Sequence, residues 1–168
     1  MIEAVIFDLD GTLINLPIDY EKLVEAFNKV TKKRDFRPLS KKILDLDEKT
    51  RKKIFRIWDN TEVEASTDIT VKDEGIAIYR RFLEKPKALV TLQGNALVRV
   101  ILPRLGLKFD HVITRENCLD REGQLTIATN SLRTAFQNIL FVGNTDNDLQ
   151  AARKVGCQFL RVANEDLV

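Results

Sequence analysis

Short apolar runs alternate with longer amphipathic segments over most of the chain, and this alternation predicts the fold class. Five runs are rich in β-branched or aromatic residues, as buried strands are, and they cover residues 4–7, 88–92, 111–114, 139–142 and 159–162. Helical patterns separate the later runs, over residues 96–105, 124–136 and 146–155. Strands that alternate with helices indicate an α/β protein in which helices cover a parallel sheet.

The segment between the first two runs has a different pattern, because its apolar positions recur at helical spacing throughout. Three stripes carry these positions: Leu23, Phe27 and Val30; Ile54, Phe55 and Trp58; and Ile78, Phe82 and Leu83. Such stripes usually bury themselves, so we expect them to pack together as a small helical cap rather than to form a cofactor or peptide groove. The predicted domains are therefore a catalytic core of residues 1–14 and 84–168 and a helical cap of residues 15–83.

The composition is that of an ordered globular protein with one catalytic unit. The chain has 168 residues, of which 44% are hydrophobic and 31% charged. A net charge of +2, without a dense block of Lys and Arg interleaved with aromatic residues, argues against a nucleic-acid partner. We expect no membrane association, because no apolar stretch approaches the roughly 20 residues that span a bilayer. The pattern leaves the oligomeric state open.

The N-terminal stretch, the cysteines and the single histidine indicate the cellular compartment and the kinds of metal site that the chain could form. The N-terminal stretch lacks a basic leader followed by a long apolar run, so we expect a cytoplasmic protein. Cys118 and Cys157 are too few and too widely spaced for a disulfide framework, which favours reduced thiols. His111 is the single histidine of the chain and excludes a histidine-rich metal site.

Two acidic residues and a glycine follow the first apolar run. Asp8 and Asp10 are separated by one residue, and Gly11 permits a turn that lets both carboxylates reach a common pocket. Ligands of open parallel sheets bind beyond the carboxyl ends of the strands, where these residues are expected. A solvated turn is the alternative, but the apolar neighbours Phe7 and Leu9 argue against it.

The run FDLDGTL around these acids resembles the first motif of the haloacid dehalogenase superfamily. The resemblance extends over most of the chain. ALVT at residues 88–91 is similar to the second motif, LGLKFDHVIT to the stretch that leads into the third strand, and ILFVGNTDNDLQAARKVGC to the fourth motif. The resemblance implies a doubly wound, Rossmann-like parallel sheet of about five strands, with a helical specificity cap inserted after the first motif.

The resemblance also implies a reaction. Asp8 would be the nucleophile that forms an aspartyl-phosphate, and Asp10 the general acid and then the general base. The hydroxyl of Thr91, with backbone N–H groups near Leu92 and Gly11, would hold the phosphoryl group. Because phosphatases of this superfamily keep the second Asp and its dehalogenases lack it, the implied substrate is a small phosphorylated metabolite.

The implied cofactor is Mg²⁺, and the fourth motif departs from the usual pattern at its metal ligand. Mg²⁺ would be held by the Asp8 carboxylate, the Asp10 main-chain carbonyl and the fourth-motif residues Asn144 and Asp148. Asn144 stands where the superfamily usually has Asp. An amide oxygen can coordinate Mg²⁺, but it carries no formal charge, so we expect weaker binding of the metal.

The third motif departs further, because no lysine occurs between Lys108 and Lys154. Arg121 is nearest to the expected position, and Arg115 is the competitor. Either arginine stays protonated and can bind phosphate with two parallel hydrogen bonds. The resemblance therefore implies a phosphate-binding role for Arg121 and leaves Arg115 as the alternative.

Three functions are compatible with these residues. The first is Mg²⁺-dependent hydrolysis of a phosphomonoester through an aspartyl-phosphate. The second is a catalytically weak or inactive relative that binds or regulates, which the departures in the third and fourth motifs motivate. The third is a phosphomutase, which transfers the group to a second hydroxyl. Asn15 and Tyr20 open the cap and are candidates to face the pocket.

Overall fold

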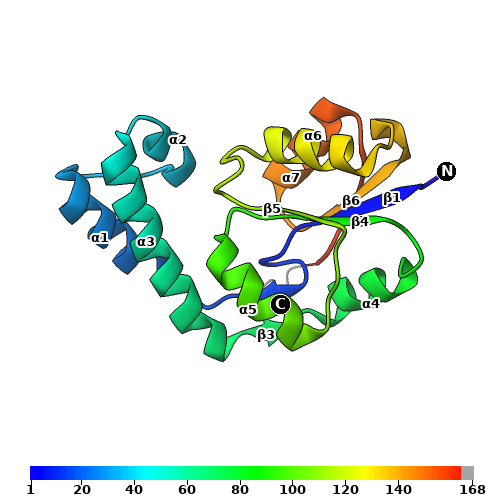
Figure 1. Ribbon diagram of the computed structural model, residues 1–168, viewed down its shortest axis with the longest axis horizontal. Coiled ribbons are helices and arrows are strands. Elements are labelled where there is room, and N and C mark those ends of the chain that lie inside the picture. The colour runs from blue at the N-terminus through cyan, green and yellow to red at the C-terminus, as the bar shows by residue number, and fades with distance from the viewer. Residues whose placement is uncertain (164–168) are drawn as a thin grey trace.

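The main sheet has five parallel strands in the computed structural model, which describes residues 1–163 of the chain. The strands are β1 (Ala4–Phe7), β4 (Lys87–Val90), β5 (His111–Ile113), β6 (Ile139–Gly143) and β7 (Gln158–Arg161). Their order across the sheet is β5-β4-β1-β6-β7, so β1 lies at the centre (Figure 1). The predicted α/β fold with a doubly wound parallel sheet of about five strands is confirmed.

The central strand β1 is buried on both faces. Val5 and Phe7 belong to one hydrophobic cluster, and Ala4 and Ile6 belong to another. This division follows from the alternation of side chains along a strand. A strand that is covered on both sides can be apolar throughout, which explains the unbroken apolar run in the sequence.

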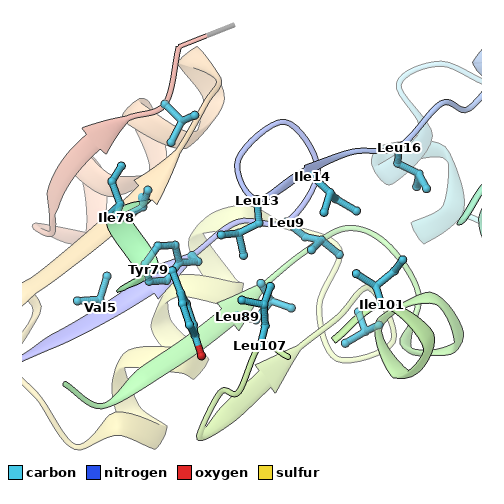
Figure 2. Packing of buried hydrophobic residues seen from close by; sticks show 14 of the residues in the cluster. Val5, Leu9, Leu13, Ile14, Leu16, Ile78, Tyr79, Leu89, Ile101 and Leu107 are labelled. Carbon is cyan, nitrogen blue, oxygen red and sulfur yellow. The ribbon is translucent and has the colours of Figure 1, made fainter. Parts of the chain in front are cut away.

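Two pairs of helices form the outer layers. α4 (Asp73–Arg81) and α5 (Asn95–Leu105) pack on the side of Val5 and Phe7, where Figure 2 shows the apolar side chains that they share with the sheet. α6 (Arg121–Leu132) and α7 (Asp146–Val155) cover the other side, and the short η2 (Phe136–Asn138) leads into β6. The result is a helix–sheet–helix sandwich.

The cap consists of α1 (Tyr20–Thr31), α2 (Leu39–Leu44) and α3 (Glu48–Ala65), followed by the single turn η1 (Ser66–Asp68). These helices have a hydrophobic cluster of their own. At its centre the Phe27 ring meets Phe36 and Trp58 edge to face, with centroid distances of 5.6 and 5.8 Å. The first two predicted stripes therefore pack together as expected.

The third predicted stripe does not join the cap. Ile78 on α4 is buried in the cluster of the main sheet, with Phe82 packed against that cluster, so the expectation that this stripe packs with the other two is wrong. The prediction of helix alone over residues 15–83 is also wrong, because β2 (Ile14–Asn15) and β3 (Thr70–Val71) pair as an antiparallel ribbon. Helical spacing identifies a buried face but not its partner. We propose that the cap is limited to α1–α3, between the two strands of the ribbon.

One helix lies earlier in the chain than its apolar pattern suggested. The prediction of a helix over residues 124–136 is wrong at both ends, since α6 spans Arg121–Leu132. Asp120 caps its start by accepting a hydrogen bond from the Gly123 N–H at 2.8 Å, and Arg133 ends it in a left-handed conformation at φ 53°. This shift places Arg121 in the first turn of the helix.

Within residues 1–163, no helix combines the length and apolar character that crossing a membrane requires.

Candidate active site

Asp8 lies at the carboxyl end of β1, where the chain leaves the sheet. Its backbone N–H donates to the Val142 carbonyl on β6 at 2.9 Å, so the residue is held between the two central strands. On one side of β1 the sheet continues through β4 and β5, and on the other through β6 and β7. This reversal of strand order creates the crevice in which doubly wound sheets bind ligands. Asp8 therefore lies at the position where the sequence predicted a reaction centre.

The turn after Asp8 depends on a glycine. Gly11 has φ +81°, a conformation that side chains with a Cβ disfavour. A Cβ at this position would also lie 2.1 Å from Nδ2 of Asn144, which follows β6. Gly11 thus allows the turn and the close approach of Asn144. Within the same turn, Oδ1 of Asp10 accepts a hydrogen bond from the Leu16 N–H at 2.9 Å.

Arg121 is the cation beside the predicted nucleophile. Its Nη2 donates to Oδ1 of Asp8 at 2.9 Å, and its Nη1 donates to Oε1 of Gln124 at 2.9 Å. Its Nε lies 2.9 Å from Oδ1 of Asp148, an ion pair without hydrogen-bond geometry. The arginine side chain is only 8% exposed, so these contacts are shielded from solvent. One guanidinium therefore joins Asp8 of the first motif to Asp148 of the fourth motif.

Asp148 has a structural role in addition to this ion pair. Its Oδ2 accepts hydrogen bonds from the backbone N–H groups of Asn144 and Thr145, both at 3.1 Å. Thr145 caps α7 and accepts a hydrogen bond from the Asp148 N–H at 3.0 Å, which completes a capping box. Oδ2 of Asp148 is thus held by the start of α7, whereas Oδ1, which pairs with Arg121 but makes no hydrogen bond, is the oxygen left to face a metal.

Thr91 directly follows β4 and is fully buried. Its hydroxyl donates to Oε1 of Gln93 and accepts from the Gln93 N–H at 3.1 Å. Its carbonyl accepts from Nε2 of Gln124 at 2.7 Å. Gln124 therefore links Thr91 to Arg121, and Gln93 holds the Thr91 hydroxyl proton that a phosphoryl oxygen would need.

Burial disfavours the ionised form of the carboxyl groups at the site. Burial raises the pKa of Asp8 to about 7; Arg121 opposes this shift, while Asp148 and Asp10 add to it. Burial also raises the pKa of Asp10, against hydrogen bonds from the backbone of Leu16 and Gly11. Three carboxyl groups share one guanidinium, so the site lacks the positive charge that would keep all three ionised.

The residues at this site fit a hard divalent cation such as Mg²⁺. Oδ2 of Asp8 and Oδ1 of Asn144 lie 3.3 and 3.5 Å from the same Thr12 hydroxyl, so both oxygens face one small region. Residues 1–163 contain no group of three or more His, Cys, Asp or Glu side chains arranged to hold a metal. The amide of Asn144 and a main-chain carbonyl would therefore have to complete the set, as Mg²⁺ permits when it keeps several waters.

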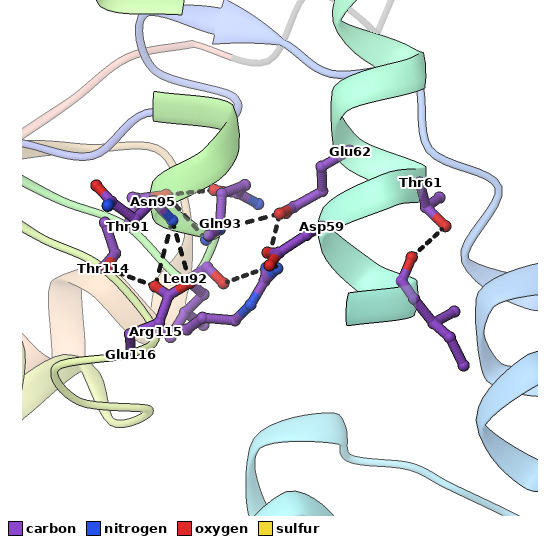
Figure 3. Close-up of polar contacts among 12 residues, drawn as sticks. Asp59, Thr61, Glu62, Thr91, Leu92, Gln93, Asn95, Thr114, Arg115 and Glu116 are labelled. Carbon is purple, nitrogen blue, oxygen red and sulfur yellow. Dashed lines mark hydrogen bonds and ion pairs between the residues drawn. The ribbon is translucent and has the colours of Figure 1, made fainter. Parts of the chain in front are cut away.

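Arg115 points to the cap rather than to Asp8. Figure 3 shows its guanidinium between two acidic residues of α3: Nη1 donates to Oε1 of Glu62 at 2.7 Å, and Nη2 donates to Oδ1 of Asp59. The guanidinium also stacks on the Trp58 ring, 4.2 Å from its centroid. The Arg115 side chain is fully buried. Of the two arginines that the sequence left open, Arg121 is the one that lies beside Asp8.

Glu62 ties the cap to the loop after β4. Its Oε1 accepts from the Gly94 N–H at 2.9 Å as well as from Arg115. Burial raises the pKa of Glu62 to about 7, against the attraction of Arg115 and the hydrogen bond from Gly94. A Cβ at residue 94 would lie 2.2 Å from Oδ1 of Asp59 and 2.6 Å from Nη2 of Arg115, so a side chain there would disturb this ion pair.

A small cleft lies between the cap and the core beside Thr91. Its volume is about 260 Å³, and it is lined by Tyr20, Leu39, Ser40 and Trp58 of the cap and by Leu92, Gln93 and Leu119 of the core. Tyr20, which the sequence marked as a candidate, thus faces this cleft. Burial raises the pKa of Tyr20, and the charges of Asp10 and Glu62 add to the shift.

A larger depression of about 720 Å³ lies elsewhere, beside the starts of β4 and β5. Lys87 lines it, but its ammonium group donates to the carbonyls of Phe82, Leu83 and Lys85. Because the depression lies at the opposite edge of the sheet from Asp8, it is not part of this site.

The sequence interpretation missed the residues that orient the site. Gln93 and Gln124 hold Thr91 and Arg121, and Glu62 holds Arg115. One signal was present for Gln124, since it stands one turn after the capping residue Asp120. Glutamine and glutamate are usually surface residues, so the sequence otherwise gives no sign that Glu62, Gln93 and Gln124 are buried.

Comparison with solved structures assigns the architecture. Solved structures of haloacid dehalogenase-like hydrolases have a fold similar to that of this chain. A hydrolase of that kind from Streptococcus pneumoniae has a TM-score of 0.68 and 18% identity over 95% of this chain and 84% of its own. No protein-family model matches the sequence, and the comparison with curated proteins finds no match.

Two further structures are similar to this chain. CbbY from Rhodobacter sphaeroides, solved in complex with phosphate, has a TM-score of 0.70 and 18% identity over 98% of this chain and 87% of its own. A predicted phosphoglycolate phosphatase from Haemophilus somnus has a TM-score of 0.66 and 20% identity over 95% of this chain and 84% of its own.

Proposed function

We propose that the chain is a Mg²⁺-dependent phosphomonoester hydrolase that acts on a small phosphorylated metabolite through an aspartyl-phosphate. The observation that carries the proposal is the pairing of Asp8, at the carboxyl end of the central strand, with Arg121. Asp10 lies two residues beyond the nucleophile, and Thr91 directly follows β4, the strand that pairs with β1. The fold supports the proposal, as do the phosphate complex of CbbY and the complex of its D10N mutant with xylulose 1,5-bisphosphate.

In the first step a carboxylate oxygen of Asp8 attacks phosphorus, and the bond from phosphorus to the ester oxygen breaks. Asp10 donates its proton to that oxygen, so the alcohol leaves uncharged; the raised pKa of Asp10 favours the protonated form that this step needs. Arg121 and the N–H groups near Gly11 and Leu92 neutralise the phosphoryl oxygens.

In the second step Asp10 takes a proton from water, which attacks phosphorus of the aspartyl-phosphate. The bond to Asp8 breaks, releasing inorganic phosphate and restoring the carboxylate. Asp8, Asn144 and the Asp10 carbonyl would hold Mg²⁺, which when bound offsets the repulsion between the Asp8 carboxylate and the phosphate. The Thr91 hydroxyl would turn from Gln93 to the phosphoryl group.

Hydrolysis of p-nitrophenyl phosphate with added Mg²⁺ tests the proposal. We expect turnover that a chelator abolishes and that Asp8→Asn reduces to background. Equal rates for the wild-type protein and Asp8→Asn would remove Asp8 from the mechanism. Acid quenching during turnover, followed by mass spectrometry, should detect phosphate on the peptide that contains Asp8.

A second candidate is phosphate binding without turnover. The observation that favours it is the ion pair in which Arg121 already holds Asp8, with Asn144 in place of a charged ligand. Tight binding of inorganic phosphate, without hydrolysis of any ester and without phosphate on Asp8, would support this candidate over the hydrolase.

A further inference from the structure

The cleft between cap and core has no charged side chain among its lining residues. Tyr20, Leu39 and Trp58 give it an apolar wall, and Ser40 and Gln93 provide neutral polar groups. Its volume of about 260 Å³ is below the roughly 300–1,000 Å³ of pockets for drug-sized ligands. The cleft is therefore suited to a small group without a formal charge.

A buried cation, Arg115, lies against the Trp58 wall of this cleft but does not line it. Arg115 is fully buried, and its two terminal nitrogens are paired with Glu62 and Asp59. Trp58, which lines the cleft, covers a face of the guanidinium. The terminal nitrogens of Arg115 are thus already engaged with α3, and a ligand in the cleft would have to displace these contacts to reach them.

The electrostatic surroundings of the cleft are instead acidic. Beyond the effect of burial, the charges of Asp10 and Glu62 raise the pKa of Tyr20 at the cleft wall, and the weaker effect of Arg115 opposes them. An anionic group placed there would lose its hydration without gaining a cation, which is unfavourable. An uncharged group would lose little.

The cleft also adjoins the phosphoryl site. Gln93 lines it and binds the Thr91 hydroxyl, and the next lining residue, Leu92, directly follows Thr91. A phosphoester held near Asp8 and Thr91 would therefore extend its leaving group into this cleft.

We propose that this cleft selects phosphomonoesters whose leaving group is small, uncharged and partly apolar, and discriminates against esters with a second anionic group. The proposal rests on the proposed function for the position of the phosphoryl group. Ser40 and Gln93 would bind a neutral hydroxyl or carbonyl of the leaving group, while Trp58 packs against its apolar part.

Binding of two matched phosphonates tests this selectivity without turnover. Phenylphosphonate and 4-phosphonobenzoate differ only in a carboxylate, and their phosphorus–carbon bond resists hydrolysis. Trp58 is the only tryptophan of the chain, so its fluorescence reports occupancy of the cleft. Calorimetry with Mg²⁺ present measures the same affinities independently. We expect the wild-type protein to bind phenylphosphonate more tightly by about tenfold or more.

A cation introduced into the cleft should reverse this preference. Ser40→Lys, with Leu119→Lys as a second variant, should tighten 4-phosphonobenzoate and remove most of the difference. Leu44→Lys is the matched control, because it adds the same charge to the exposed end of the same helix as Ser40. It should leave the ratio of affinities unchanged.

Three results would overturn the proposal. The first is wild-type binding of 4-phosphonobenzoate that equals or exceeds that of phenylphosphonate. The second is an unchanged ratio in both lysine variants, each folded by circular dichroism. The third is tight anion binding that Arg37→Ala removes, since Arg37 lines the adjacent depression with Tyr20 and Leu39. Failure of the proposed function would differ: the binding preference would hold, but phenyl phosphate would not be hydrolysed.

Discussion

Nη2 of Arg121 lies 2.9 Å from Oδ1 of Asp8, although 113 residues separate the two in the chain. The pairing joins the first turn of α6 to the end of the central strand. It places a permanent positive charge where a phosphoryl group attached to Asp8 would need one. The same guanidinium reaches Asp148, so its position is fixed from two sides.

Replacement of Arg121 should separate the effect of its charge from that of its geometry. We expect Arg121→Met to lower kcat/KM for p-nitrophenyl phosphate by about 100-fold or more, because the variant loses a buried group that stabilises the phosphoryl oxygens. Arg121→Lys should recover part of the activity, since it keeps the charge but cannot bind Asp8, Asp148 and Gln124 together. Arg153→Met, an exposed change on α7, is the control and should be silent. Unaltered kinetics in Arg121→Met would refute the assigned role.

The charge of the fourth motif can be restored at Asn144. We expect Asn144→Asp to lower the Mg²⁺ concentration needed for half-maximal activity, because a carboxylate attracts a hard cation more strongly than an amide does. The rise in Tm on adding Mg²⁺ should increase as well, which gives a measurement that does not depend on turnover.

Asn147→Asp is the matched control for this change. It adds the same charge three residues later, on the exposed face of α7. If both variants shift the Mg²⁺ curve equally, the effect is general electrostatics. If neither shifts it, Asn144 does not bind the metal.

The sequence predicted the sheet well because its strands are buried on both faces. β1 agrees with the run of residues 4–7, and α7 agrees with the pattern over residues 146–155. In these elements the apolar positions of the sequence are the positions that the fold buries. Ile78 shows the limit, since its helical stripe predicted a buried face but not that the face would meet the main sheet.

The candidate site could be predicted where one local segment carries it, and not where distant segments meet. Asp8, Asp10 and Gly11 share one turn, so the sequence could place them together. Arg115 and Arg121 have the same chemistry and lie six positions apart, so the residue type could not separate them. Asp120 decides the outcome, because it starts α6 immediately before Arg121 and directs that side chain to the end of the sheet.

Gly11 should be intolerant of any side chain for two separable reasons. Gly11→Ala places a Cβ at φ +81° and 2.1 Å from Nδ2 of Asn144. Gly106→Ala meets the same backbone strain at φ +65°, but nothing lies within 4 Å of its Cβ. We expect both variants to lose about 1 kcal/mol of stability from strain. Only Gly11→Ala should also displace Asn144 and lose most activity.

Urea unfolding and kcat/KM measured on the two alanine variants check this distinction. Full activity in Gly11→Ala would show that the Asn144 side chain can move without consequence. Loss of activity in Gly106→Ala would show that strain alone, far from the site, accounts for the effect.

Glu62 should make stability depend on pH through the contact between cap and core. Its pKa is raised from 4.5 to about 7 by burial, so the folded protein holds a proton at Glu62 that the unfolded chain has released. Between these two values the folded state binds more protons, and the free energy of unfolding must fall as the pH rises.

The groups that face Glu62 are Arg115, Asp59, Tyr20 and the Gly94 N–H. Glu62→Gln keeps the hydrogen-bond acceptor but cannot titrate, so its stability should fall less between pH 5 and pH 7, by on the order of 1 kcal/mol for each unit of pKa shift. Urea unfolding followed by Trp58 fluorescence at several pH values measures this difference, and Glu64→Gln on the exposed face of α3 provides the control. Since Asp8 titrates in the same direction in every variant, only the difference between Glu62→Gln and the wild type reports on Glu62. Parallel pH profiles for these two proteins would mean that Glu62 stays ionised when buried, held by Arg115.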